Sequence, residues 1–217
     1  MIRMHKQTGL EYIPFGVVEV RYPAREQWRE EDFFALAAEE LEACRRRYPD
    51  YERKAVFGEH PYVRFFKKFK KTYPVLLQFE SVMFKGQPFP ADNPVTAVPF
   101  LLELTTLVLS GTHDVERLQG PVTLYPATEK EPFQGRGGRE LHTYPGDFCA
   151  RDEGGIIFSA IAGTDGRTCA WPESRHVFYP VFGTPELPAS VIEQAVEKLE
   201  GYVSVLAPQA AVESALL

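Results

Sequence analysis

The chain has 217 residues, of which 44% are hydrophobic and 25% charged, and its formal net charge is -6. This composition is that of a globular protein and excludes disordered and fibrous classes. The acidic balance argues against a general nucleic-acid coat protein and against DNA as a partner, because phosphate neutralisation needs an excess of Lys and Arg. For a chain of this length we expect one domain, residues 1–217, around a single core.

The N-terminal sequence and the cysteines indicate the compartment. MIRMHKQTGLEY is polar and has no apolar signal region, and no segment approaches the roughly 18 apolar residues of a membrane span. Cys44, Cys149 and Cys169 are odd in number and lack CxxC spacing, so neither a disulfide framework nor a zinc site is predicted. We therefore expect a cytoplasmic protein with no metal, no cofactor and no membrane partner.

The first half of the chain predicts one strand and four helices. Residues 12–22 are rich in β-branched and aromatic types and predict a central strand. Apolar residues recur every three to four positions over 28–48 and 60–72, which predicts amphipathic helices. Residues 76–86 predict a short helix closed by a glycine, and a long apolar helix is predicted over 94–109.

The long helix is unusual in its composition. Its polar residues are Thr96, Glu103, Thr105 and Thr106, so we expect it to be buried on most sides and to end at Ser110-Gly111.

The second half changes to short β-type segments separated by Gly, Pro and Asp: PVTLYPA, DFCAR, GIIFSAIAG and HVFYPVFG. A helical period returns over 188–206, and we expect the tail beyond it to fray. Helices and strands must then share one core. The predicted fold class is α/β (mixed α+β), a mixed sheet with helices packed on it.

Two short motifs place polar residues on turns. SGTHD, residues 110–114, follows the long helix; the plainer interpretation is that Thr112 or Asp114 caps a short helix, VERL, and that His113 is exposed. GTDGRT, residues 163–168, contains Asp165-Gly166, a signal of a hairpin turn. Alternatively its acid, base and hydroxyl, including Thr168, hold a polar ligand at a strand end.

Two further segments have simple structural interpretations. Arg151 and Asp152 close a strand before a glycine pair, and a surface ion pair is expected there. RFFKKFKK, residues 64–71, interleaves aromatic and basic residues as single-stranded RNA surfaces do, but its helical spacing favours core aromatics and solvated lysines. The sequence has no HExxH, GxSxG or GxGxxG, so zinc proteases, α/β-hydrolases and Rossmann dehydrogenases have no motif support.

Three segments occur in a fixed order between roughly residues 60 and 183: YPVLLQFESVMFKGQPFPADNPV, SGTHDVERLQG and YPGDFCARDEGGIIFSAIAGTDGRT. Together they resemble the B3/B4 family, the editing domain of the phenylalanyl-tRNA synthetase beta subunit, and especially its small free-standing relatives. The resemblance implies a mixed α/β sandwich around a pocket that accepts the aminoacylated 3′ end of tRNA. It also implies hydrolysis of a wrongly attached amino acid, a correction needed where binding alone discriminates poorly.

The resemblance carries over to single residues only in part. Asn93 matches the family's Asn-x-Val run, Asp114 matches the acid after the helix, and Asp165 lies where the family has its editing glutamate. Where the synthetase has a Thr-Asn pair, this sequence has Pro99-Phe100. The editing histidine of the family aligns with Gly111, and His113 follows two positions later.

The resemblance thus implies an aminoacyl-tRNA deacylase that acts in trans on a mischarged tRNA. His113 and Asp165 are the candidate catalytic residues, because either can orient a water against an ester that is already activated. The remaining candidates bind substrate: Glu80 at the pocket mouth, Asn93, Asp114, Thr168, Arg151 at the carbonyl or a phosphate, and Gly154 and Gly155 at the 3′ adenosine. Lys67, Lys68, Lys70 and Lys71 are expected to steer the tRNA electrostatically.

Two alternatives remain open. A catalytically silent pocket that binds a free amino acid or a related small ligand is favoured by the acidic charge and by the missing Thr-Asn pair. Association with a synthetase as a structural partner is the other. The sequence leaves open the amino acid specificity, the tRNA identity and the oligomeric state.

Overall fold

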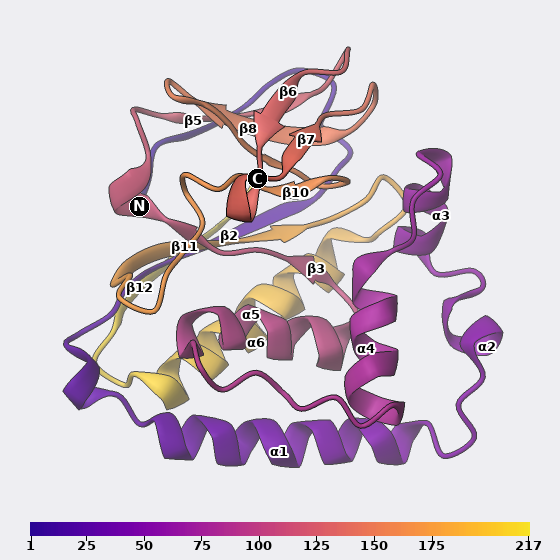
Figure 1. The fold of residues 1–217 in the computed structure, drawn as a ribbon, viewed down its shortest axis with the longest axis vertical. Helices are drawn as coiled ribbons and strands as arrows, with labels where there is room; N and C mark the ends of the chain where they lie inside the picture. Colours follow the sequence, from indigo (N-terminus) through magenta and orange to yellow (C-terminus); the bar gives the residue numbers. More distant parts are fainter.

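The computed structural model describes residues 1–217 as stacked layers. From the top of Figure 1 downwards these layers are one β-sheet, a second β-sheet, a pair of helices and a single long helix. The predicted fold class, mixed α/β, is confirmed.

The upper sheet, sheet A, has five strands. Its order is β1 (Met4–Lys6), β5 (Val122–Pro126), β8 (Phe148–Asp152), β9 (Gly155–Ser159) and β10 (Gly163–Thr164). The first pair is parallel and the others are antiparallel. A separate hairpin of β6 (Pro132–Gln134) and β7 (Glu140–His142) stands above it (Figure 1).

The second sheet, sheet B, is built around the predicted central strand. Its order is β12 (Ala211–Leu216), β2 (Phe15–Arg21), β11 (His176–Phe182) and β3 (Leu109–Ser110), and β4 (His113–Asp114) also pairs with β11. Six of the seven residues of β2 are buried because sheet A covers one face and helices cover the other (Figure 1). This explains why the sequence of β2 is almost continuously apolar.

Six α-helices complete the fold: α1 (Glu30–Arg47), α2 (Arg53–Phe57), α3 (Pro61–Lys68), α4 (Pro74–Phe84), α5 (Pro94–Thr106) and α6 (Ala189–Leu206). Helices α5 and α6 form the layer below sheet B, and α1 covers them from the other side (Figure 1). Helix α5 therefore has neighbours on most of its faces, as its apolar sequence predicts. No helix in the structure has the length and apolar character needed to cross a bilayer.

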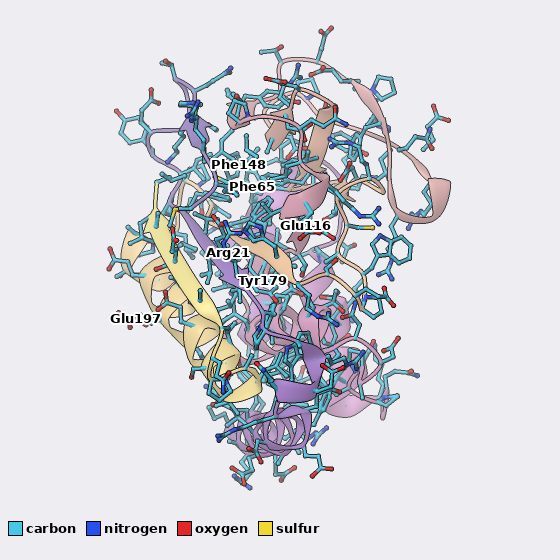
Figure 2. All side chains as sticks on the ribbon, turned by 90° about the vertical axis from the view of Figure 1, so that its left-hand side faces the viewer. Arg21, Phe65, Glu116, Phe148, Tyr179 and Glu197 are labelled. Carbon is cyan, nitrogen blue, oxygen red and sulfur yellow. The ribbon has the colours of Figure 1, made fainter.

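One continuous core of 51 buried residues joins these layers. Between the two sheets it is aromatic: Phe15, Phe148, Phe158 and Phe182 meet edge to face or stacked, with ring centroids 4.9 to 6.4 Å apart. In Figure 2 Phe148 lies inside the molecule, whereas Glu197 points outward from α6. The high aromatic content is thus used mainly for core filling.

Three expectations about elements were wrong. Helix α5 ends at Thr106, because Leu107 takes a left-handed conformation (φ 59°) and Leu109–Ser110 becomes strand β3. The C-terminal tail does not fray, since β12 pairs along the whole of β2. Asp165-Gly166 does not join a hairpin; the Asp165 carboxylate instead closes a turn by accepting from the backbone N–H of Thr168.

Two side-chain expectations were also wrong. His113 is fully buried rather than exposed, although Asp114 does cap the short helix by accepting from Glu116 N at 3.0 Å. Arg151 and Asp152 do not pair with each other, because neighbours on a strand face opposite ways. The interpretation of residues 64–71 is confirmed: Phe65 and Phe66 are buried and the lysines are exposed.

Candidate functional site

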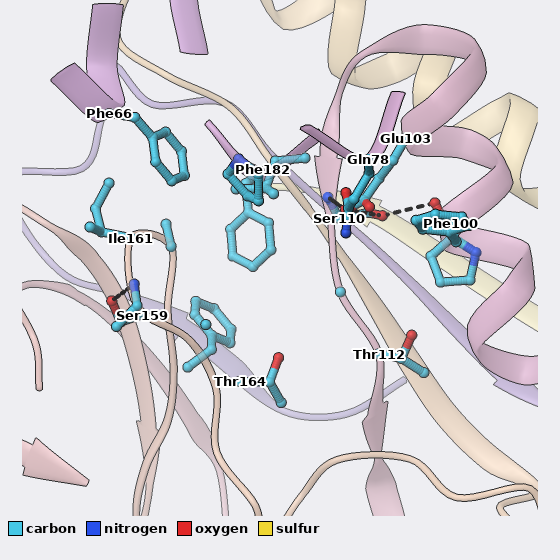
Figure 3. Close-up of a pocket in the computed structure, with 18 of the residues that line it drawn as sticks. Phe66, Gln78, Phe100, Glu103, Ser110, Thr112, Ser159, Ile161, Thr164 and Phe182 are labelled. Atoms are coloured by element: carbon cyan, nitrogen blue, oxygen red, sulfur yellow. Dashed lines mark hydrogen bonds between the residues drawn. The ribbon is translucent and has the colours of Figure 1, made fainter. Parts of the chain in front are cut away.

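A cavity of about 390 Å³ lies between helix α5 and the turn that joins β9 to β10 (Figure 3). Its wall is formed by the first turns of α4, by one side of α5, by residues 109–112, by residues 158–164 and by Phe182 of β11. The volume is at the lower end of the range for small-molecule sites in proteins. It suits a group of about the size of an amino acid.

Aromatic rings form much of this wall. Phe66, Phe100, Phe158 and Phe182 all line the cavity, and the rings of Phe158 and Phe182 meet edge to face at 4.9 Å. These rings come from helices α3 and α5 and from strands β9 and β11 of the two sheets. The packing of the whole core therefore fixes the shape of the cavity. An apolar, rigid wall of this kind binds a ligand by shape and hydrophobic contact.

Glu103 is the one acid on the wall. It comes from α5, is 8% exposed, and its Oε1 accepts hydrogen bonds from Ser110 N (2.9 Å) and Ser110 Oγ (3.2 Å). Burial raises the pKa of Glu103 to about 8, and the Ser110 donors offset only part of that effect. At neutral pH this group is therefore an uncharged carboxylic acid that can both donate and accept.

Gln78 of α4 also lines the cavity and carries an unsatisfied acceptor. Its Oε1 is shielded from solvent and has no hydrogen-bond partner in the protein. In Figure 3, Gln78, Glu103 and Ser110 gather beside α5, away from Ile161 and Ser159. An unpaired buried polar atom is costly, so its presence on a cavity wall is typical of a binding site.

The two candidate catalytic residues are brought together by the fold, but they lie behind the wall. Thr168 Oγ1 donates to Asp165 Oδ1 and lies 2.8 Å from His113 Nδ1. Neither His113 nor Asp165 lines the cavity, whereas their chain neighbours Thr112 and Thr164 do (Figure 3). Successive residues of an extended backbone point to opposite faces, which explains this alternation.

The hydrogen bonds fix the tautomer and charge of His113. Because the single hydroxyl proton of Thr168 goes to Asp165, we assign the proton in the second bond to His113 Nδ1, which leaves Nε2 unpartnered. Burial lowers the pKa of His113 to about 3, so the ring is neutral and stacks on Phe178 at 4.8 Å. Burial also raises the pKa of Asp165, against the opposing hydrogen bonds from Thr168.

Three of the proposed substrate-binding residues lie outside the cavity, and two of them, Glu80 and Asp114, use their side chains in structural contacts. Glu80 accepts from Tyr51, Lys85 and Arg53, and the Arg53 contact lowers the pKa of Glu80 to about 2. Asn93 is the buried N-cap residue of α5, and its Oδ1 has no partner. Besides capping, Asp114 accepts from Ser174 Oγ at 2.6 Å.

The residues around the glycine pair also lie outside the cavity. Arg151 donates to both oxygens of Glu131, at 2.7 and 2.8 Å, and its guanidinium lies 4.2 Å from the ring centre of Tyr125. Glu153 and Gly154 form the turn between β8 and β9, and Gly155 begins β9 with φ +124°, a value that favours glycine. Thr168 is fully buried between His113 and Asp165.

The four proposed tRNA-steering lysines are all exposed. Lys68 lies 3.8 Å from Glu186, and Lys71 lies 5.3 Å from the ring centre of Tyr144. Of all the site residues that the sequence predicted, Lys71 alone lines the cavity.

The cavity does contain the positions at which the sequence departs from the family pattern. Pro99, Phe100 and Gly111 all line it. Sequence reasoning missed Gln78, Thr112, Thr164 and above all Glu103 as site residues. The signal for Glu103 was a single acid within an apolar helix. No group of three His, Cys, Asp or Glu side chains is arranged to hold a metal ion.

Comparison with known proteins gives one consistent relationship. No family model matches the chain. A stretch of 71 residues, 32% of the chain, is 37% identical to the phenylalanine–tRNA ligase beta subunit of Mycoplasma genitalium, and it covers 9% of that protein.

The fold resembles the crystal structure of an N-terminal fragment of the phenylalanyl-tRNA synthetase beta-subunit from Pyrococcus horikoshii, with a TM-score of 0.50. The match covers 97% of this chain and 50% of that chain at 10% identity, a level that shows the fold alone. The chain is therefore similar to the phenylalanyl-tRNA synthetase beta subunit in part of its sequence and in its fold. It spans only a small part of the first of these proteins and half of the second.

Proposed function

We propose that this protein hydrolyses a mischarged aminoacyl-tRNA in trans and that the cavity beside α5 receives the aminoacyl group. One observation carries the proposal. Pro99, Phe100 and Gly111, which the sequence resemblance assigns to an editing pocket, line one cavity although they come from separate segments. The similarity to a tRNA ligase subunit in sequence and fold supports the same substrate class.

The chemistry required is modest. An aminoacyl ester is already activated, so a positioned water and a donor to the developing oxyanion suffice without a covalent nucleophile. Thr112 and Thr164 place two hydroxyl groups on the cavity wall, where they can orient the water or donate to the oxyanion. His113, Thr168 and Asp165 are then positioning residues, because their hydrogen bonds tie the segments that carry these two threonines.

The surroundings of the cavity fit an anionic, extended substrate. Lys71 lines the cavity, and the exposed Lys67, Lys68 and Lys70 lie beside it in the chain. In this arrangement the lysines attract the tRNA backbone while the aminoacyl group enters the apolar cavity.

A second candidate function is binding of a free amino acid or related small ligand without turnover. It is favoured by the charge state of the wall, where the titratable groups are Lys71 and Glu103. Because the pKa of Glu103 is raised to about 8 by burial, no ionised carboxylate faces the cavity at neutral pH to act as a general base.

A deacylation screen tests the proposal. The protein is incubated with a panel of correctly and wrongly charged tRNAs, alongside Thr112→Val, Thr164→Val, His113→Ala and Asp165→Ala. Release of one amino acid is expected, and loss of an oxyanion donor should slow it about 10²-fold. Thr128→Val, at an exposed threonine that does not line the cavity, is the matched control and should be unchanged.

Absence of release from every tRNA in the panel would exclude the deacylase. Calorimetric binding of a free amino acid in the same preparation would then establish the second candidate.

A further inference from the structure

The acceptor atoms beside α5 lack a matching donor. Glu103 Oε1 takes both hydrogen bonds from Ser110, and Oε2 has no protein partner. Gln78 Oε1 is buried without a partner on the same cavity wall. No cationic side chain is among the groups that shift the pKa of Glu103. Gln78 Oε1 is thus a buried acceptor without a donor, Glu103 Oε2 is a free carboxyl oxygen on the same wall, and the protein supplies no cation to either.

We propose that Glu103 and Gln78 form a subsite for the ammonium group of a ligand. In an aminoacyl ester this group is the α-ammonium. That last identification rests on the proposed function, whereas the preference for a cation does not. An ammonium has three N–H donors and no acceptor, so it can satisfy both oxygens at once.

The neighbouring groups leave room for this role. Tyr62 and Tyr73 are the titratable groups whose charge Glu103 influences, and their hydroxyls donate to the carbonyl oxygens of Phe182 and Leu107. Burial raises the pKa of both phenols, so they stay neutral. Besides Glu103, the titratable group on the wall is Lys71, and its side chain is exposed. A cation that enters therefore meets no buried protein cation near Glu103.

Binding of an ammonium should also release a proton. Without ligand, burial keeps Glu103 protonated at neutral pH. A cation against the carboxyl favours its ionised form, so the protonated acid and R–NH3⁺ give a carboxylate–ammonium pair and one H⁺ that passes to solvent. A neutral hydroxyl in the same place would bind the protonated acid and release no proton.

The experiment compares esters that differ only in the amino group. The methyl esters of alanine, leucine and phenylalanine are titrated against the desamino esters methyl propanoate, methyl 4-methylpentanoate and methyl 3-phenylpropanoate. Binding is followed by NMR and by calorimetry at pH 6.5 in buffers of different ionisation enthalpy. We expect at least one amino ester to bind about tenfold or more tighter than its partner. Up to one proton should leave per ligand bound.

The variants separate this role from a structural one. Glu103→Gln keeps the shape and the Ser110 contacts but should abolish both the preference and the proton release. Gln78→Leu removes one acceptor but leaves the carboxyl of Glu103, so it should weaken the preference for the amino ester at every pH tested. Glu197→Gln, the same change on the exposed face of α6, should behave as the wild type.

The inference is overturned if each desamino ester binds as tightly as its amino ester, if none of the esters binds, or if Glu103→Gln keeps the preference. Failure of the deacylation screen with the amino preference intact would remove the proposed function only. Deacylation without the preference would remove only this inference.

Discussion

Two buried polar clusters flank the cavity, and they differ in what they face. The cluster of Glu103, Ser110 and Gln78 lines the cavity; Gln78 Oε1 is buried without a partner, and Glu103 Oε2 forms no hydrogen bond in the protein. The cluster of His113, Thr168 and Asp165 lies behind the cavity wall, where hydrogen bonds join all three side chains.

The comparison teaches that internal hydrogen bonding distinguishes a supporting cluster from a binding one. A cluster whose polar groups are hydrogen-bonded to one another fixes local structure, whereas a cluster with unpaired polar groups can bind a ligand. His113 Nε2 is the single exception in the supporting cluster. The two clusters also perturb opposite ionisations, since burial keeps Glu103 protonated and His113 deprotonated.

The largest expected effect is a loss of stability as the pH rises, and it comes from the burial of Glu103. Its pKa is about 8 in the folded protein against 4.5 for the unperturbed group. Ionisation therefore favours the unfolded chain progressively as the pH rises from about 4.5 to about 8. Over that window the free energy of unfolding of the wild type should fall, relative to Glu103→Gln, by several kcal/mol and at most about 5.

Urea unfolding of both proteins at pH 4.5, 6, 7 and 8.5 measures this difference. A difference that stays constant across these pH values would show that Glu103 ionises normally and faces water. Glu197→Gln, an exposed acid, should give no such trend.

A comparable effect of opposite direction is expected from His113. Its pKa is about 3 in the folded protein against 6.5 for the unperturbed ring. Its contribution to stability is present above about pH 6.5 and is lost as the pH falls toward 3, because the unfolded chain binds the proton first. Relative to His113→Phe, the wild type should lose several kcal/mol between pH 6.5 and 3.5.

Chemical unfolding across that range measures the loss. His5→Phe, the same change at an exposed histidine, is the control. If the two histidine variants show the same pH dependence, His113 is accessible to protons in the folded state and the buried cluster is misassigned.

The smallest effect concerns the surface beside the cavity. Replacement of Lys67, Lys68, Lys70 and Lys71 by Ala should weaken tRNA binding and flatten its dependence on salt. Each lost phosphate contact should reduce the slope of log K against log salt by about 0.7 to 0.9. Filter binding at several salt concentrations provides the measurement. An unchanged affinity and slope would remove these lysines from the interface. As a control, Lys198→Ala removes one positive charge from α6, outside this group of lysines.

The sequence predicted five of the six helices and most of the long strands because each has a clear period or composition; helix α2, with only 5 residues, was missed. The helix over 28–48 corresponds to α1 and that over 188–206 to α6, and the strand over 12–22 is central in sheet B. The tail was missed because β12 is mostly exposed, and its pairing with β2 orders it.

The candidate site could be predicted only as a region. The resemblance led to the segments around Pro99, Gly111 and Thr164, which do line the cavity. It could not predict which side of each segment faces inward, because one residue along a strand reverses the direction of a side chain. His113 and Asp165 were chosen for their chemistry, while their neighbours hold the wall. Glu103 was seen only as a polar residue in an apolar helix.

The central claim is that the cavity beside α5 is the ligand site, and backbone NMR with a non-hydrolysable aminoacyl-adenosine analogue tests it most directly. We predict that the amide signals of Ser110, Thr112 and residues 160–164 shift on titration, and that those of α1 do not. Shifts confined to other surfaces, with these amides unchanged, would contradict the account.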